Sequence, residues 1–299
     1  MQFIFSPEYE KPDIGPHIFP LQKYRLVKDM LVRNKIALED EFLIPEKAQF
    51  SDILLVHTES YIKKLIDGKL SMRDQMQLEL PYSRELGDAA LYCVGGSIKA
   101  FEVAAYHNVG VHIGGGFHHA FPDHGEGFCV LNDVAVTIAK ALSEEKSKRS
   151  LVVDCDLHQG NGTAYIFRDN PLVFTFSMHQ GNIYPYPKEN STLDIELSTG
   201  MDDTIYNKLL DKNLINIIRD FKPDSIFYIA GADPFEGDQL SALHLSIEGL
   251  RNRDSIVIGH AKKNKLPVMI SLAGGYAVNV ENTVRIHYNT CLEAQKYYI

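Results

Sequence analysis

Two adjacent histidines, His118 and His119, follow a run of three glycines and are the first candidates for chemistry in this chain. Glycine lets a backbone approach a ligand closely and adopt positive φ. Imidazoles titrate near neutral pH, so a pair of them suits acid-base work, although one of two neighbouring histidines is often simply packed. Asp154 and Asn161 are their candidate partners. A buried carboxylate raises histidine basicity more than an amide does, which predicts one charged or orienting ring and one neutral base.

A second candidate set consists of Asp156, His158 and Asp233. Two carboxylates and one imidazole can hold a catalytic metal ion and leave one or two coordination positions open. The Asp-x-His spacing alone is a weak signal, because a polar turn with a satisfied histidine has the same pattern. The second carboxylate, at the equivalent point of a later predicted strand, favours a metal site. This ligand set suits zinc and iron alike.

Tyr276 follows Gly274 and Gly275 and is the third candidate. A phenol on a glycine turn can donate a hydrogen bond to a developing oxyanion beside a metal ion. The alternative is a core or wall tyrosine, since the chain has 15 tyrosines. Its position at the end of the last predicted strand favours the site.

These residues must be positioned by an alternation of helices and strands that begins near residue 83. Near-continuous apolar strands separated by amphipathic helices predict an α/β fold, with a mostly parallel central sheet and helices on both faces. No linker or repeat interrupts the pattern, so we expect a single domain spanning residues 1–299. The predicted strands are 109–113, 151–153, 172–176, 225–230 and 267–272. The predicted helices are 83–106, one capped by Asn132, 163–167, 202–221, 246–262 and 279–294.

Ligands of such sheets bind beyond the carboxyl ends of the strands. The histidine pair follows the first of the five predicted strands. Polar groups also follow the other four strands, namely Asp154, Ser177 with His179, Asp233, and Tyr276. We therefore predict that all five strand ends deliver polar groups to one rim.

The composition of the chain restricts its partners and its compartment. An acidic chain, with a net charge of -9, has no general attraction for nucleic acid or anionic membranes. No apolar run is long enough to span a bilayer, and the first residues lack the basic and apolar regions of a signal peptide. The 4 cysteines show no CxxC spacing, which is typical of free thiols in a reducing compartment. We expect a cytoplasmic protein without direct nucleic-acid or membrane binding; an oligomer is possible.

Taken together and in order, the motifs resemble those of the histone deacetylase family, which has an arginase-like α/β fold. Weaker likeness covers the N-terminal third, as in HIFP at 17–20 and VHTESY at 56–61. Within the family the chain looks most like the class IV deacetylases and their bacterial relatives, because Asn161 stands where class I members carry aspartate. The runs that carry the resemblance are GGGFHHA at 114–120, GEGFCVLND at 125–133, DCDLHQGNG at 154–162, GADPFEGDQL at 231–240 and LAGGY at 272–276.

The resemblance implies hydrolysis of an acyl group, acetyl or longer, from the lysine side chain of a protein or peptide. It implies one Zn²⁺ per chain on the two aspartates and the histidine described above. His119 is then the general base, His118 supports the developing charge, and Tyr276 stabilises the transition state. The implied substrate-tunnel residues are Gly127, Phe128, Tyr184, Leu240 and Gly275. The implied site of a structural K⁺ ion consists of Asp154, Asp156, His158 and Ser177.

Three positions refine what the resemblance implies about activity and substrate. Sluggish members have histidine where this chain has Tyr276, so we expect full activity. Acetylpolyamine-selective members carry an acidic gatekeeper where this chain has Leu240, which argues against polyamines. Class I members clamp the substrate backbone with a rim aspartate, and no counterpart can be placed in residues 79–85. Peptide-backbone recognition is therefore not implied.

Three other functions are alternatives to lysine deacylation. The chain could deacetylate a small-molecule amide, or it could be a catalytically inactive acyl-lysine binder. The intact set of catalytic positions speaks against the inactive binder. An arginase-type hydrolase needs two manganese ions and additional aspartates, and the chain supplies one ligand set.

Overall fold

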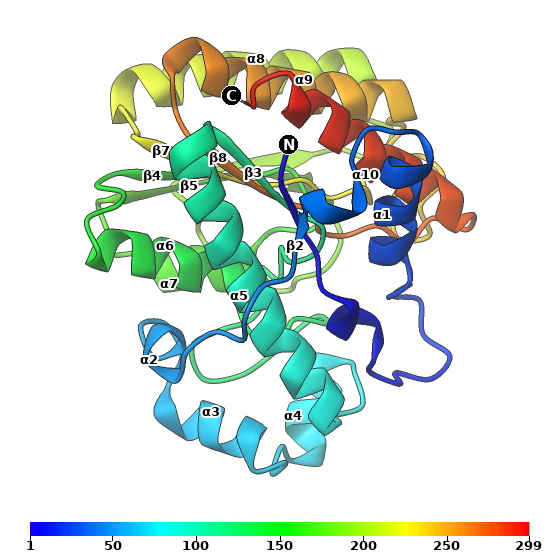
Figure 1. The fold of residues 1–299 in the computed structure, drawn as a ribbon. Helices are drawn as coiled ribbons and strands as arrows, with labels where there is room; N and C mark the ends of the chain where they lie inside the picture. Colours follow the sequence, from blue (N-terminus) through cyan, green and yellow to red (C-terminus); the bar gives the residue numbers. More distant parts are fainter. Residues whose placement is uncertain (299) are drawn as a thin grey trace.

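An eight-stranded sheet forms the centre of the computed structural model, which describes residues 1–298 (Figure 1). The strand order is β2-β1-β3-β8-β7-β4-β5-β6, and every pair of neighbours is parallel. The strands are β1 (Phe3–Ile4), β2 (Phe42–Leu43), β3 (Val109–His112), β4 (Ser150–Asp154), β5 (Val173–Gln180), β6 (Leu193–Leu197), β7 (Ser225–Ile229) and β8 (Val268–Ser271).

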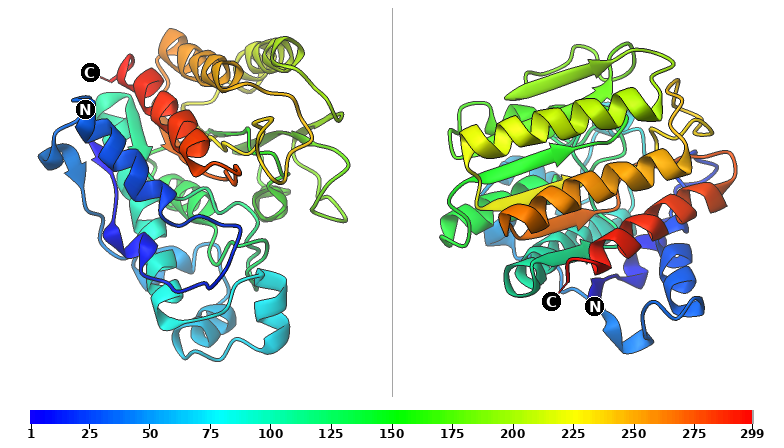
Figure 2. Two further views of the ribbon diagram at one scale, coloured as in Figure 1. Left: turned by 90° about the vertical axis from the view of Figure 1, so that its right-hand side faces the viewer. Right: turned by 90° about the horizontal axis from the view of Figure 1, so that it is seen from above.

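Helices cover both faces of this sheet, as the two further views in Figure 2 show. One face carries α1 (Lys23–Arg33), α8 (Asp203–Phe221), α9 (Ile247–Asn264) and α10 (Val280–Gln295). The other face carries α5 (Arg84–His107), α6 (Asp133–Ser143) and α7 (Asn161–Phe167). Alternate strand residues belong to the two cores: Leu151 and Val153 pack on the first face, and Val152 packs on the second. The predicted α/β fold, with a parallel sheet between two helical layers, is confirmed.

A small helical lobe packs against the N-terminal half of α5, at the bottom of Figure 1. It contains α2 (Phe50–Ile53), α3 (Glu59–Ile66) and α4 (Met72–Leu78). Two 3-10 turns, Pro7–Glu10 and Glu39–Glu41, complete the N-terminal third. The lobe contributes to the site because Glu79, the residue that caps the end of α4, lines a cavity described below.

The predicted elements are present, and their ends differ from the predicted ones by at most four residues. Asn132 caps α6 as expected, because its Oδ1 accepts the backbone N–H of Ala135 at 2.9 Å. The strand predicted at 172–176 is longer in the structure, where β5 continues to Gln180. Ser177 and His179 therefore lie inside a strand rather than after it. Pairing with β6, which the sequence analysis missed, extends β5 through these polar residues.

The order of the strands explains how distant residues meet. β3, β8, β7 and β4 are consecutive neighbours in the sheet, although they lie far apart along the chain. Because all four are parallel, their carboxyl ends lie at the same edge. The segments after these four strands carry the histidine pair, Tyr276, Asp233, and Asp156 with His158. Four of the five predicted strand ends thus place polar residues at one edge of the sheet. Within residues 1–298, no helix is both long and apolar enough to cross a lipid bilayer.

The contact between α5 and β3 depends on a glycine. A Cβ atom added at Gly110 would overlap the carbonyl oxygen of Ala100 on α5, whereas Gly259 on α9 has open space around its Cβ position. We predict that Gly110→Ala lowers the free energy of unfolding by about 1–3 kcal/mol through overpacking. Gly259→Ala, the matched control, should raise it by about 0.5–1 kcal/mol because alanine favours a helix. Urea denaturation of both variants measures the two effects, and equal stabilities would contradict the proposed packing.

Candidate active site

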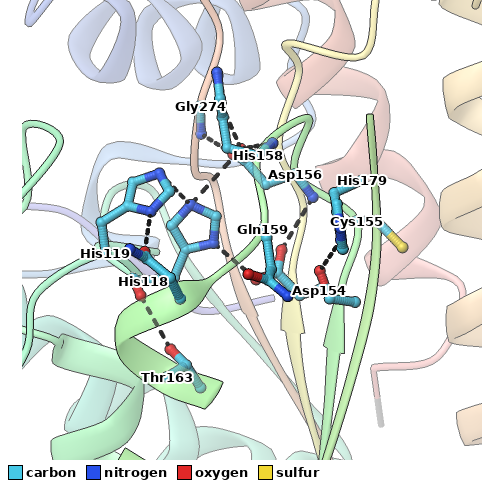
Figure 3. A network of polar contacts seen from close by, with 12 residues as sticks. His118, His119, Asp154, Cys155, Asp156, His158, Gln159, Thr163, His179 and Gly274 are labelled. Carbon is cyan, nitrogen blue, oxygen red and sulfur yellow. Dashed lines mark hydrogen bonds and ion pairs between the residues drawn. The ribbon is translucent and has the colours of Figure 1, made fainter. Parts of the chain in front are cut away.

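Figure 3 shows the polar groups that lie at the carboxyl ends of the parallel strands. His118 and His119 come from the segment after β3, and their rings lie side by side with centroids 4.1 Å apart. Asp154 ends β4, and Asp156 and His158 follow it. All five side chains are buried. The site therefore places several ionisable groups together away from bulk water.

The glycine turn before the histidines is held by a buried carboxylate. Gly115 and Gly116 have φ values of 72° and 77°, a left-handed conformation that glycine adopts without strain. Asp133, at the start of α6, accepts the backbone N–H of Gly116 at 3.1 Å and that of Phe117 at 2.8 Å. Ser97 on α5 donates a hydrogen bond to the same carboxylate. The turn is thus fixed from the helix layer beneath it.

The two histidines have different partners on their outer nitrogens. Nδ1 of His118 lies 2.7 Å from Oδ2 of Asp154, and Nδ1 of His119 lies 2.6 Å from Oδ1 of Asn161. The two Nε2 atoms face each other at 3.1 Å. The structure therefore brings together the histidines and the two partners that the sequence analysis proposed for them.

This difference in partners gives the rings different charges. Burial lowers the pKa of His118, but the carboxylates of Asp154 and Asp156 outweigh burial and raise this pKa to about 9. Burial and the positive charges of His118 and His158 hold the pKa of His119 well below its ordinary value. At neutral pH, His118 is charged and His119 is neutral. A neutral imidazole beside a charged one can accept a proton.

Asp156, His158 and Asp233 form a second group, which we call the ligand cluster. One ligand atom from each residue lies within 4.8 Å of the others, and all three residues are buried. Nδ1 of His158 is 3.3 Å from Oδ1 of Asp156 and 3.4 Å from Oδ2 of Asp233. Burial lowers the pKa of His158, but the two carboxylates outweigh it and raise that pKa to about 10. Both carboxylates therefore face the same imidazole nitrogen.

The oxygen atoms of the cluster fit a metal ion. Oδ1 and Oδ2 of Asp156 accept the backbone N–H groups of His158 and Gly274, each at 3.0 Å. Oδ1 of Asp233 accepts that of Leu157 at 3.0 Å, whereas its buried Oδ2 has no hydrogen-bond donor. A buried carboxylate oxygen without a donor is costly, so Oδ2 of Asp233 fits the role of a ligand to a cation. One imidazole and two carboxylates are ligands that zinc accepts.

Two glycines keep the space around these oxygens open. A Cβ atom at Gly231 would lie 2.6 Å from Oδ2 of Asp156 and 2.6 Å from Oδ1 of Asp233. A Cβ atom at Gly274 would lie 2.5 Å from Oδ2 of Asp156. All three distances are shorter than real Cβ contacts. The carboxylates can therefore occupy these positions only because both neighbours are glycine.

Arg253 on α9 holds the two turns that carry the carboxylates. Its guanidinium is fully buried, and Nη1 donates to the carbonyl oxygens of Cys155 at 3.2 Å and Gly231 at 2.5 Å. Nε and Nη2 donate to Oδ1 of Asp254 at 3.0 and 2.8 Å. Oδ2 of Asp254 accepts the hydroxyl of Thr290 on α10 at 2.6 Å. No sequence pattern indicates this role, because Arg253 falls in an otherwise ordinary amphipathic helix.

A cavity of about 260 Å³ is lined by His119 of the histidine pair and by His158 of the ligand cluster. Four of the five predicted tunnel residues line this cavity, and the fifth, Gly275, is not among its lining residues. The lining residues are Glu79, His119, Gly127, Phe128, His158, Tyr184, Leu240 and Tyr276. Glu79, in the stretch 79–85 where no counterpart of the rim aspartate could be placed, also lines this cavity. The left-handed conformation of Glu79, with φ 59°, ends α4 and brings this carboxylate to the cavity, which no sequence pattern reveals.

Beneath the cluster, a smaller hollow is lined by Lys23, Asp156, His118 and Tyr276 among others. Lys23 is fully buried, and its Nζ donates to the carbonyl oxygen of Ala273 at 2.6 Å. The rings of Phe19, Tyr24 and Tyr276 lie 5.1–5.5 Å from this ammonium group. Burial lowers the pKa of Lys23 to about 8. The sequence analysis missed Lys23, because a lysine in an amphipathic helix is usually exposed.

Glu126 lies in the GEGFCVLND motif at 125–133, and no role for it was predicted from the sequence. Its Oε1 accepts the side-chain N–H of Asn161 and the hydroxyl of Tyr184, each at 2.7 Å. Its Oε2 accepts the side-chain N–H of Gln77 at 3.1 Å and lies 3.5 Å from Nε2 of His124. Burial raises the pKa of Glu126, but these hydrogen bonds outweigh it and lower the pKa to about 2. The residue is a carboxylate at every working pH.

The proposed monovalent-cation residues also lie near one another. Asp154 and Ser177 are register partners on β4 and β5, and the backbone N–H of Asp156 donates to Oδ1 of Asp154 at 3.1 Å. His158 follows in the same turn. Ser177 Oγ lies 2.9 Å from Nδ1 of His179. A K⁺ ion on Asp154, Asp156, His158 and Ser177 stays a prediction.

The family of this chain follows from its similarity to known proteins. A family model described as the histone deacetylase domain matches residues 17–291. The chain belongs to this family. An uncharacterized protein of Picosynechococcus is 36% identical to it over 95% of both chains. Histone deacetylase 2 of Arabidopsis thaliana is 29% identical, with 92% of this chain and 74% of that protein aligned.

A solved structure agrees on the fold. The crystal structure of an HDAC homolog from Aquifex aeolicus matches with a TM-score of 0.84 and 24% sequence identity. The match covers 98% of this chain and 84% of that chain. The chain is therefore a deacetylase-family protein with the family's α/β fold, and its buried ligand cluster is consistent with the zinc site of histone deacetylases.

The ligand cluster predicts a metal-dependent stability. Adding Zn²⁺ to chelator-treated protein should raise Tm, because a ligand at 100 times its Kd stabilises the folded state by about 2.7 kcal/mol. Asp233→Asn should abolish this shift, since it removes the charge of the carboxylate whose Oδ2 lacks a donor. Asp169→Asn, at a carboxylate with 90% side-chain exposure, is the matched control and should keep the shift. Thermal denaturation measures all three, and a full zinc shift in Asp233→Asn would exclude this cluster as the metal site.

Proposed function

We propose that this protein is a zinc-dependent hydrolase that removes acyl groups from the lysine side chains of proteins or peptides. The observation that carries the proposal is the neutral His119, which lines a cavity beside a metal-ligand cluster and is flanked by the charged His118. A neutral base in the lining of a cavity suits attack of water on an amide that binds there.

The roles of the residues follow from their positions. Nε2 of His119 accepts the proton of the attacking water. His118, held by Asp154, stabilises the negative charge that develops. Tyr276 lines the same cavity and donates its hydroxyl hydrogen to the oxyanion. Burial and the charges of Asp233 and Asp156 keep the pKa of Tyr276 well above its ordinary value, so the phenol retains this hydrogen.

The ligand cluster completes this arrangement. Asp156, His158 and Asp233 would hold a divalent ion, which would supply polarisation of the amide carbonyl and a lowered pKa of water. After the tetrahedral intermediate forms, His119 returns its proton to the leaving amine, and the products are lysine and a carboxylate. No covalent bond to the protein is required.

The cavity supports a lysine side chain in a peptide over a small amide. Phe128 and Tyr184 supply aromatic surface for an aliphatic stem, and Leu240 places an apolar group where an acidic one would select polyamines. Glu79 can accept a backbone N–H of the peptide that carries the lysine, a contact that a small amide lacks. We extend the proposal to an acyl-lysine protein or peptide as partner, a structural K⁺ ion, and a cytoplasmic location.

Two finer assignments complete the proposal. Asn161, as the partner of His119, supports a class IV-like position within the family. We also propose that residues 1–299 act as one catalytic domain, because both helical layers contribute to the site. Deacetylation of a small-molecule amide is the competing function.

We predict that His119→Ala lowers kcat by about 10²–10⁴-fold, the usual contribution of a positioned base. Tyr276→Phe should lower kcat by about 10²–10³-fold through loss of one oxyanion donor. Amine release from acyl-lysine peptides of increasing acyl length measures both effects. Tyr106→Phe, at a tyrosine with 87% exposure far from the cavity lining, is the control and should be unchanged. Undiminished turnover in His119→Ala would overturn the assigned mechanism.

Glu79 distinguishes a peptide from a small substrate. Glu79→Gln should raise KM for an acyl-lysine peptide roughly tenfold, the value of one hydrogen bond to a charged group. It should leave KM for a single N-acyl-lysine without flanking peptide bonds unchanged. Glu59→Gln, an exposed glutamate on α3, is the matched control. Better turnover of small amides than of peptides, with no effect of Glu79→Gln, would favour the competing function.

A further inference from the structure

Asn161 presents two chemically different faces, and catalysis depends on which one meets His119. The amide oxygen accepts hydrogen bonds, whereas the amide nitrogen only donates them. If the oxygen faces His119, Nδ1 of the ring must carry the hydrogen and Nε2 is free to accept a proton. If the amide is reversed, Nδ1 must be the acceptor and Nε2 carries the hydrogen. A reversed amide therefore gives a ring that cannot act as the base at Nε2.

Glu126 decides between these two orientations. A carboxylate is an acceptor only, so the amide atom 2.7 Å from Oε1 of Glu126 must be the nitrogen of Asn161. The oxygen of Asn161 then necessarily faces Nδ1 of His119 at 2.6 Å. The neighbours of Glu126 keep this carboxylate in place, since Tyr184 donates to Oε1 and Gln77 donates to Oε2. Only 17% of the Glu126 side chain is exposed, which limits competition from water.

The other side of the histidine pair is compatible with the same tautomer. Nδ1 of His118 lies 2.7 Å from Oδ2 of Asp154, and its Nε2 faces Nε2 of His119 at 3.1 Å. Only one hydrogen fits between these two Nε2 atoms. With the hydrogen of His119 on Nδ1, its Nε2 can be the acceptor of this contact.

We propose that Glu126 is a positioning residue that fixes the orientation of the Asn161 amide and thereby the tautomer of His119. Glu126 does not touch the substrate carbonyl or the ligand cluster. It acts through Asn161 on the base and, through the Tyr184 hydroxyl, joins the base to the wall of the cavity. The consequence for catalysis rests on the proposed function of His119, whereas the tautomer itself does not.

The test is the tautomer of His119 in the zinc-loaded protein, read from ¹H–¹⁵N correlations of ¹⁵N-histidine. His119→Gln identifies its signals among those of the 12 histidines. In the unsubstituted protein we expect the hydrogen on Nδ1. In Glu126→Gln, which puts an amide against the donors around position 126, we expect a mixture or the Nε2–H tautomer. Its kcat should fall on the order of 10²-fold, the lower range of acid-base catalysis, with KM little changed.

A rescue separates this role from a merely structural one. In the Glu126→Gln background, Asn161→Asp supplies an acceptor that cannot be reversed and that the new amide can donate to. The double variant should regain the Nδ1–H tautomer and most of the lost kcat. Tyr184→Phe should instead raise KM and keep the tautomer, because the bond between Glu126 and Asn161 is intact. Glu102→Gln, at an ion-paired glutamate on α5, is the matched control and should change neither property.

Several outcomes would overturn the proposal. These are an Nε2–H tautomer in the unsubstituted protein, an unchanged tautomer in Glu126→Gln, or a double variant no better than the single one. If Glu126→Gln does not fold, as judged by circular dichroism, Glu126→Asp keeps an acceptor-only group and must keep the Nδ1–H tautomer. Absence of turnover on every acyl-lysine peptide would refute the proposed function while leaving the tautomer measurements valid.

Discussion

Burial of negative charge is the constraint on which the rest of this structure depends. The parallel strands bring the carboxylates of Asp154, Asp156 and Asp233 together in an interior closed to bulk water. Each would be strongly destabilising alone, because an unpaired buried charge costs several kcal/mol. His118 lies against Asp154, and His158 lies against Asp156 and Asp233. The chemistry of the site follows from this pairing, since it leaves His119 as the ring whose Nδ1 faces an amide instead of a carboxylate.

A second layer of residues gives this charge arrangement its geometry. Asp133, Arg253 and Glu126 each contact backbone or side-chain groups that in turn hold a histidine or a carboxylate. Each is a group whose hydrogen-bonding character cannot be reversed: carboxylates only accept, and a guanidinium only donates. Such groups fix the orientation of ambiguous partners, such as amides and imidazoles. This layer explains how loops at a sheet edge can hold a site with little freedom of movement.

Much of the fold and the centre of the site could be predicted from the sequence. Apolar runs revealed β3, β4, β7 and β8, and the motifs after them contained the histidines, their partners and the ligand cluster. The two-residue strands β1 and β2 were missed because so short a segment has no measurable periodicity. Strand β6 was missed because its residues are only partly buried.

The supporting residues could not be predicted, because their roles depend on partners that are distant in sequence. Glu126 contacts residues 35 and 58 positions away, and Lys23 contacts a carbonyl 250 positions away. Neither spacing nor composition indicates such pairs. Glu79 reaches the cavity only because the end of α4 turns through a left-handed residue. Local patterns thus identify the groups that do chemistry, while the groups that orient them emerge from tertiary packing.

Arg253 connects the site to the helices in a way that affects how the protein unfolds. One guanidinium joins the turns after β4 and β7, and Asp254 extends the connection to Thr290 on α10. Those turns cannot separate unless a buried cation loses its partners, and α9 cannot leave the sheet while the turns hold it. Neither the turns nor α9 can therefore unfold locally, and they unfold together. Backbone amides of α9 and of the two turns should consequently exchange hydrogen with solvent as one cooperative unit, rather than as a mobile rim on a rigid sheet.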